Sequence, residues 1–104
     1  MSLNLNTLAK EFYDNAAAHG FWENPNKGER IALMHSELSE ALEAIRKPKE
    51  SDKCPGFSAE VEELADAIIR ILDYCAFYGL SIHEAVMAKH EYNKKRPYKH
   101  GKQF

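Results

Sequence analysis

Residues 58–79 read SAEVEELADAIIRILDYCAFYG, and this stretch does most to decide the fold. Its apolar side chains recur every three or four positions, which is the spacing of one face of an α-helix. Ser58 is a favourable N-cap residue, and Gly79 is a favourable C-terminal stop. The pattern therefore predicts a helix from Ala59 to about Tyr78. The side chains expected to point inward are Val61, Leu64, Ala65, Ile68, Leu72, Cys75 and Ala76.

Two further helices are predicted on the N-terminal side of this stretch. Residues 3–18 carry apolar side chains at helical spacing, and His19-Gly20 supplies a stop. After a loop rich in turn formers, a second stretch with the same spacing ends near Lys47-Pro48. The apolar face of this second stretch consists of Ile31, Met34, Leu38, Ala41 or Leu42, and Ile45.

A fourth helix is predicted on the C-terminal side. Ser81 and Glu84 have the spacing of a capping box, and apolar residues continue from there toward Arg96-Pro97. Residues 48–57 include two prolines and a glycine, a composition that suits a loop rather than a strand. We therefore expect an all-α fold without strands, built as a small four-helix bundle or array.

Length and composition limit the class of protein. The chain has 104 residues, so residues 1–104 are expected to form one domain. Its net charge of -2, from 14 basic and 16 acidic residues, provides no basic field for a nucleic-acid polymer. Cys54 and Cys75 match no paired metal spacing, and no apolar run approaches the ~18 residues of a membrane span. We expect a soluble, cytoplasmic protein that binds neither nucleic-acid polymer nor membrane.

Four carboxylates occur as two pairs with helical spacing. Glu37 and Glu40 are three positions apart, which places them on one face with Cβ atoms about 5–6 Å apart. Glu63 and Asp66 repeat this spacing on the next predicted helix. Each pair lies one position before the apolar row of its helix, so the carboxylates border the expected core. If the two helices pack side by side, all four carboxylates converge.

Convergence of this kind points to a cation. Four carboxylates in a partly desolvated place repel one another by several kcal/mol unless something compensates. Mg²⁺ prefers oxygen ligands and keeps open positions for substrate phosphates, whereas zinc prefers Cys and His. The competing interpretation is that such pairs belong to a solvated helix face, which is the commoner role for either pair taken alone.

The acidic pattern, together with the C-terminal stretch, resembles a known family. HSELSEALEAIRK (35–47), AEVEELADAIIRILDYC (59–75) and KHEYNKKRPYKHGK (89–102) are similar to segments of the MazG-like, all-α nucleoside triphosphate pyrophosphohydrolases. The family pattern is ExxE followed by EExxD, and here it reads Glu37-x-x-Glu40 and Glu62-Glu63-x-x-Asp66.

The resemblance implies a function and a set of site residues. It implies hydrolysis of a nucleoside triphosphate to the monophosphate and pyrophosphate with Mg²⁺, for which Mn²⁺ often substitutes. The same carboxylates would then be both metal ligands and catalytic residues, and the helical bundle would be completed as a homodimer or homotetramer. On the basic C-terminal stretch, the residues expected to face the nucleotide are Lys89, Asn93 and Arg96.

Aromatic residues are weaker candidates for substrate binding. Phe21 and Trp22 lie in a polar loop before the second predicted helix, where a ring could stack on a base, although anchoring in the core is the commoner role. Tyr98 belongs to the C-terminal stretch and could close over the nucleotide. For Lys89 and Arg96 the competing interpretation is a solvated helix end whose charge complements the helix dipole.

Two other functions stay open from the sequence. A phosphoribosyl-ATP pyrophosphohydrolase resembles this superfamily in fold and metal chemistry. A non-catalytic helical interaction module, whose acidic face binds cations or a basic partner, is the alternative from a different class.

Overall fold

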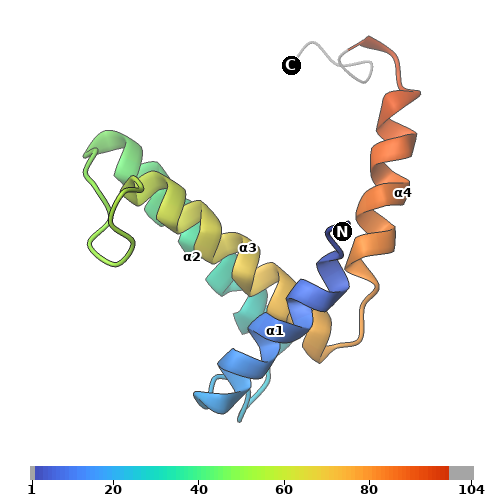
Figure 1. Cartoon of the computed structure of the whole chain (residues 1–104), viewed down its shortest axis with the longest axis horizontal. Coiled ribbons are helices and arrows are strands. Elements are labelled where there is room, and N and C mark those ends of the chain that lie inside the picture. Colours follow the sequence, from blue (N-terminus) through green and yellow to red (C-terminus); the bar gives the residue numbers. More distant parts are fainter. Residues whose placement is uncertain (1, 99–104) are drawn as a thin grey trace.

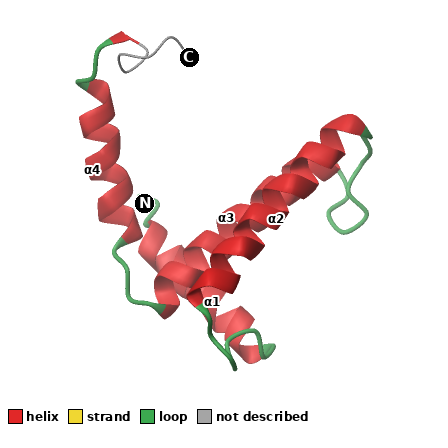
Figure 2. Cartoon of the chain, turned by 180° about the vertical axis from the view of Figure 1, so that it is seen from behind, coloured by secondary structure: helices red, strands yellow, loops and turns green. Residues whose placement is uncertain are grey.

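The chain folds into four helices, as shown in the computed structural model, which describes residues 2–98 (Figure 1). They are α1 (Leu5–Ala18), α2 (Lys27–Arg46), α3 (Ala59–Phe77) and α4 (Ile82–Lys94). Within the described residues there is no strand, only an isolated antiparallel bridge between Glu50 and Ser58. The all-α prediction is confirmed, and Figure 2 shows the loops that join the helices. In the same part of the chain, no helix combines the length and apolar character needed to cross a membrane.

Helix ends follow the local signals at three of the four N-termini. Asn4 and Asn26 cap α1 and α2 with their side-chain oxygens, and Ser58 accepts a hydrogen bond from the Val61 amide at 3.1 Å. Gly79 ends α3 with a φ of +66°, a conformation that side chains other than glycine adopt at a cost. Both ends predicted for the third helix are therefore confirmed.

The predicted capping box at the start of α4 is wrong. Ser81 makes no side-chain cap hydrogen bond, and Glu84 instead accepts from the Asn6 amide of α1 at 2.8 Å. The Asn6 side-chain oxygen accepts from the backbone N–H of His83 at 3.0 Å, and His83 Nδ1 accepts from the Leu5 N–H at 3.1 Å. The starts of α1 and α4 thus cap each other, because tertiary packing brings their unsatisfied amides together.

The closest packing is between α2 and α3, which form an antiparallel hairpin, and between α1 and the C-terminal half of α3. The buried side chains are mostly small, and Glu37 is among them with 8% of its surface exposed. The buried apolar residues on the helices are Ala9, Ala16, Ala41, Ala59, Ala67, Leu72 and Cys75. Small residues let helix backbones approach closely, and Ala41, Ala67 and Glu37 are buried in the hairpin while most of its large apolar side chains stay exposed.

The large apolar side chains of the hairpin face away from its interior, which corrects the predicted inward rows. We call this surface the apolar stripe; its residues, 40% to 56% exposed, are Leu38, Leu42, Ile45, Val61, Leu64 and Ile68. On α3, Leu72 and Cys75 are buried as predicted because α1 covers that half of the helix. The N-terminal half has no such cover, because α4 stands apart from the hairpin in both ribbon views (Figures 1 and 2).

The single chain is therefore open rather than a closed bundle. Its radius of gyration is 16.0 Å, compared with about 13 Å for a compact domain of this length. Its accessible surface is 7963 Å², about 2,000 Å² more than a compact monomer of this mass exposes. The four predicted helices are present, but one copy of the chain does not enclose a core between them.

Candidate metal and nucleotide site

One row of α3 supplies the polar wall of a cleft. Glu63, Asp66, Arg70 and Asp73 are three or four positions apart, so they share one helix face. The cleft has a volume of about 660 Å³, within the range of small-molecule sites. Ile69 of α3 also lines the cleft, and side chains from α1, α2 and the two loops complete it: Phe12, Asn15, Ala16, Phe21, Arg30, Glu37, Glu40 and Lys53.

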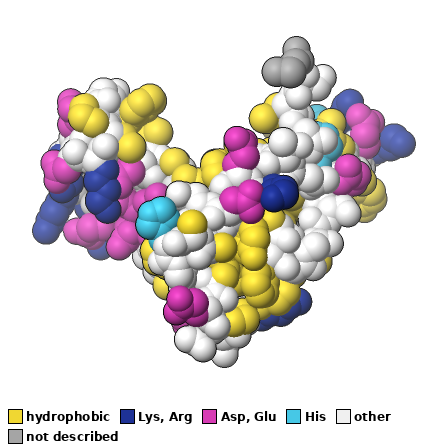
Figure 3. Space-filling view, turned by 60° about the horizontal axis from the view of Figure 1, so that its bottom comes forward, with side chains coloured by type: hydrophobic (Ala, Val, Ile, Leu, Met, Phe, Trp, Pro, Cys, Tyr) yellow, Lys and Arg dark blue, Asp and Glu magenta, His cyan; other side chains and the backbone are white. Residues whose placement is uncertain are grey.

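All four carboxylates singled out in the sequence line this cleft. Oxygens of Glu37, Glu63 and Asp66 lie within 4.8 Å of one another, close enough to bind one cation together. Glu40 lines the cleft beside them, and its proximity contributes to the raised pKa of both Glu37 and Glu63. Figure 3 shows acidic side chains gathered on the left-hand lobe, which is the arm formed by α2 and α3. These residues come together because α2 and α3 pack side by side.

The cluster is under electrostatic strain that Arg70 relieves in part. Arg70 Nε lies 3.4 Å from a carboxylate oxygen of Glu37. Burial and the neighbouring carboxylates raise the pKa of Glu37, and the Arg70 charge opposes this. Burial and the charge of Glu62 raise the pKa of Asp66, against the charges of Lys53 and Arg70. The positive side chains offset only part of the repulsion among the acids.

Glu63 carries the clearest sign that a cation fits here. Burial, followed by the hydrogen bond and charge of Glu40, raises its pKa to about 7 from the ordinary 4.5. Its Oε2 atom is buried and has no hydrogen-bond partner. A buried carboxylate oxygen without a donor is costly, and a divalent cation satisfies it as a ligand. The donor set consists of oxygens alone, which suits Mg²⁺ or Mn²⁺.

The raised pKa of Glu63 predicts how the metal-free chain responds to pH. Below pH 4.5 Glu63 is protonated in both folded and unfolded chains, so it contributes no pH dependence. Between pH 4.5 and about 7 the unfolded chain releases the proton while the folded chain still holds it, so rising pH favours unfolding. Denaturant unfolding in EDTA at pH 5, 6 and 7 should show this loss in the parent. Glu63→Gln should make this loss smaller, although Glu37 and Asp66, whose pKa values are also raised, still contribute to it; an equal slope in both proteins would contradict the assignment.

Four charged residues of the cleft were not among the predicted site residues. Arg70 and Asp73 had a readable signal, since they are charged positions on the Glu63 and Asp66 face of an otherwise apolar stretch. Arg30 of α2 donates to the Phe21 carbonyl and lies over the Trp22 ring. Lys53 belongs to the loop 47–58, and no local sequence pattern predicts the path of this loop.

Trp22 does not have an open ring face. It is 8% exposed, stacks on Phe77 at 4.2 Å between ring centroids, and has the Arg30 guanidinium 4.3 Å from its ring centre. Two groups at these distances must occupy opposite faces, so a base cannot stack on Trp22 in this arrangement. The core role, which is commoner for such a residue, is the one observed. Phe21 is 59% exposed, and it and Phe12 are the aromatic residues that line the cleft.

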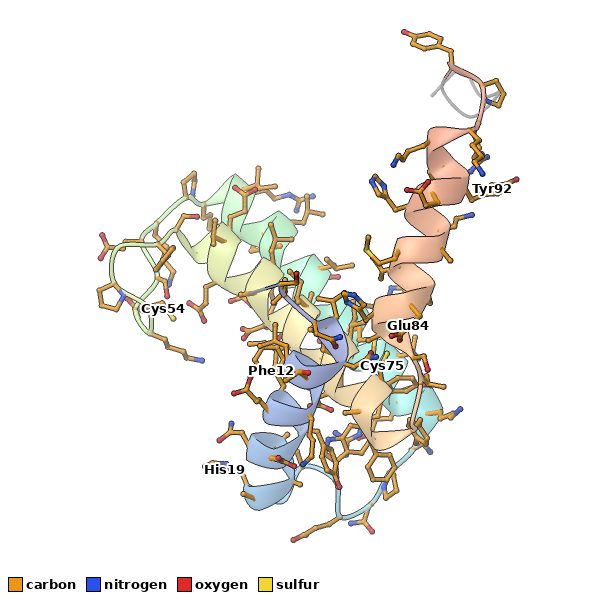
Figure 4. The ribbon with its side chains drawn as sticks, turned by 45° about the vertical axis from the view of Figure 1, so that its right-hand side comes forward. Phe12, His19, Cys54, Cys75, Glu84 and Tyr92 are labelled. Carbon is orange, nitrogen blue, oxygen red and sulfur yellow. The ribbon has the colours of Figure 1, made fainter. Side chains whose placement is uncertain are left out.

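The C-terminal candidates lie away from the cleft within one copy of the chain. Lys89 and Arg96 lie over the ring of Tyr92, at 4.7 and 5.6 Å from its centre. Figure 4 labels Tyr92 on α4, well separated from Phe12 beside the hairpin. Asn93 shares this end of α4, and Tyr98 is 88% exposed. Residues 99–102 of the basic stretch lie outside the described residues.

Comparison of the chain with protein-family models, curated proteins and solved structures gives no match.

Proposed function

We propose that the chain hydrolyses nucleoside triphosphates, or their deoxy forms, to the monophosphate and pyrophosphate with the help of Mg²⁺. One observation carries the proposal: carboxylates from two helices converge at a cleft, and a buried Glu63 oxygen among them has no partner. A site for a cation alone needs no cleft of 660 Å³ beside it. The MazG-like resemblance supports the same chemistry.

The two ends of the cleft differ in a way that suits a nucleotide. Lys53 belongs to the loop 47–58 and Glu63 to the first turns of α3 after it, whereas Phe12 belongs to α1 and Phe21 to the loop that follows α1. Glu63 and Asp73 are ten positions apart on α3, which corresponds to about 15 Å along the helix. We place the phosphates at the acidic end and the base between the phenylalanines, where flat rings stack favourably.

The reaction breaks one phosphoanhydride bond. The oxygen of a water molecule bonds to the α-phosphorus, the bond to the oxygen bridging to the β-phosphorus breaks, and pyrophosphate leaves with that oxygen. The proton of the water passes to a carboxylate of the cluster, Glu40 or Glu63. A bound Mg²⁺ supplies charge neutralisation for the phosphates and lowers the pKa of water. Arg70 holds Glu37 in place at 3.4 Å.

The test is a turnover assay. The purified chain with Mg²⁺ and a panel of ribo- and deoxyribonucleoside triphosphates should release monophosphate and pyrophosphate, and EDTA should abolish release. Release of inorganic phosphate alone would contradict cleavage at the α-phosphorus. Turnover of phosphoribosyl-ATP but of no free triphosphate would favour the phosphoribosyl-ATP pyrophosphohydrolase. No turnover with any of them, despite tight Mg²⁺ binding, would favour the interaction module.

We further propose that a second copy of the chain covers the apolar stripe. The excess surface of about 2,000 Å² and the exposed row on both hairpin helices favour self-association. Lys89, Asn93 and Arg96 are not among the residues that line the acidic cleft of their own chain, and α4 projects away from the hairpin. In a dimer or tetramer, α4 of one copy reaches the cleft of another, and this is how we reconcile these residues with a phosphate-binding role.

Mixing of two inactive variants checks this arrangement. Arg96→Ala should lose about tenfold to a hundredfold in catalytic efficiency, the worth of one charge-assisted hydrogen bond, while it keeps its carboxylates. When it is unfolded and refolded with Glu63→Gln, half of the dimers are mixed. Each mixed dimer then has one cleft with intact acids and an intact Arg96, so about a quarter of the parent activity should return. No recovery in verified mixed dimers would place Arg96 outside the partner's cleft.

A further inference from the structure

The loop 47–58 is fixed in place by hydrogen bonds around Ser51, a residue only 3% exposed. The Ser51 N–H donates to the Phe57 carbonyl at 2.8 Å, and its hydroxyl accepts from the Cys54 N–H at 2.9 Å. The Ala59 N–H donates to the Lys49 carbonyl at 2.9 Å and closes the base of the loop. These bonds give the loop a defined path at the far end of the hairpin, where Figure 4 labels Cys54.

Glu62 ties this loop to the helix that carries the acids. The Ser51 hydroxyl donates to a carboxylate oxygen of Glu62. Glu62 immediately precedes Glu63, so the loop is anchored one residue away from the cluster. In the ExxE and EExxD pattern, Glu62 is therefore the acid that holds the loop, while Glu63 and Asp66 face the cleft.

The anchored loop brings one cation to the acidic end of the cleft. Lys53 lines the cleft together with Glu40, Glu63 and Asp66, and its charge lowers the pKa of Asp66. Within the described part of the chain, the Lys53 ammonium forms no ion pair at 4.0 Å or less, whereas its neighbour Lys49 pairs with Asp52 at 3.7 Å. If a divalent metal binds at the carboxylates, an anion bound to that metal can also pair with the Lys53 ammonium.

We infer that Lys53 is a phosphate-binding residue, which the Ser51–Glu62 contact positions to hold the phosphate end of a metal-bound ligand. The inference rests on the proposed function for the type of ligand and deepens it by naming the group that grips the phosphates within one chain. An ammonium acts as a point charge that any phosphate oxygen can approach, which suits release of pyrophosphate after the reaction. Arg70 is unsuited to this role because it pairs with Glu37.

Calorimetry with Mn²⁺ and inorganic pyrophosphate tests Lys53 without turnover. Lys53→Ala should weaken pyrophosphate binding to the Mn²⁺-loaded chain about tenfold, the worth of one charged hydrogen bond. Affinity for Mn²⁺ alone should stay equal or rise slightly, because a repelling charge has left the rim. Lys53→Arg should retain pyrophosphate binding. Lys49→Ala, which removes a lysine from the same loop, is the control. It should bind Mn²⁺ and pyrophosphate as the parent does.

The outcomes separate this inference from the proposed function. Parent-like pyrophosphate binding by Lys53→Ala, an equal loss in Lys49→Ala, or no binding by the parent overturns the role of Lys53, whatever the turnover assay shows. Weakened Mn²⁺ binding in Lys53→Ala also overturns the role of Lys53, because Lys53 would then act by positioning the carboxylates that bind the metal. If pyrophosphate binding depends on Lys53 but no triphosphate is hydrolysed, the phosphate site stands and the proposed function fails.

Discussion

Glu63→Gln should reduce turnover about a hundredfold or more while the helices stay intact. Glu63 has the buried oxygen without a partner, and its other neighbours in the cluster are carboxylates. An amide can offer only a neutral oxygen to a cation, and a loss of several kcal/mol of charge stabilisation corresponds to two or more orders of magnitude in rate. The measurement is kcat with the best triphosphate at saturating Mg²⁺, alongside Mn²⁺ affinity and circular dichroism.

Stability provides an independent test of the same variant. Because burial and Glu40 disfavour the charged form of Glu63, removal of this charge should raise the unfolding temperature of the metal-free chain at pH 8. Glu60→Gln is the matched control, since Glu60 lies on the same helix but is exposed. It should change neither turnover nor metal affinity. Parent-like turnover in Glu63→Gln, or an equal loss in Glu60→Gln, would contradict the site.

Local signals predicted the helices but not the packing between them. Ser58 and Gly79 mark the ends of α3 correctly because their effects act within a few residues. The capping box failed because Glu84 has a better partner in Asn6, 78 positions away in the chain. Ile68 was predicted to point inward because helical spacing identifies a face and leaves open which element covers it. Within one copy, none of the described helices covers that face.

The site was predictable only as far as it follows helical spacing. Glu37 and Asp66 met as expected because their pairs lie on adjacent antiparallel helices. Lys53 could not be predicted, because its place depends on the hydrogen bonds of a buried serine in an irregular loop. Trp22 and Phe21 are neighbours in sequence, and the chain path alone decides which of them is buried.

Leu42→Glu should convert the protein from an oligomer to a monomer. We expect sedimentation of the parent to show no monomer at micromolar concentration, with the apolar stripe as the contact. Leu42 is 53% exposed in one copy, and its burial is worth about 1.5–3 kcal/mol. In a symmetric interface each residue occurs twice, and a buried glutamate without a partner adds a further cost. The dissociation constant should therefore rise about a hundredfold or more.

Leu3→Glu is the control for this change, because Leu3 is also exposed and apolar but lies outside the stripe. It should sediment as the parent does.

The excess surface of about 2,000 Å² exceeds the roughly 800 Å² that each partner buries in an interface of standard size, so there is room for a large dimer contact or for two contacts in a tetramer. The monomeric Leu42→Glu should also lose activity if α4 completes the cleft of another copy, because its own cleft retains every carboxylate but no longer receives Arg96. A fully active monomer would separate the two proposals: the acids would then suffice within one chain, and the stripe would serve assembly alone.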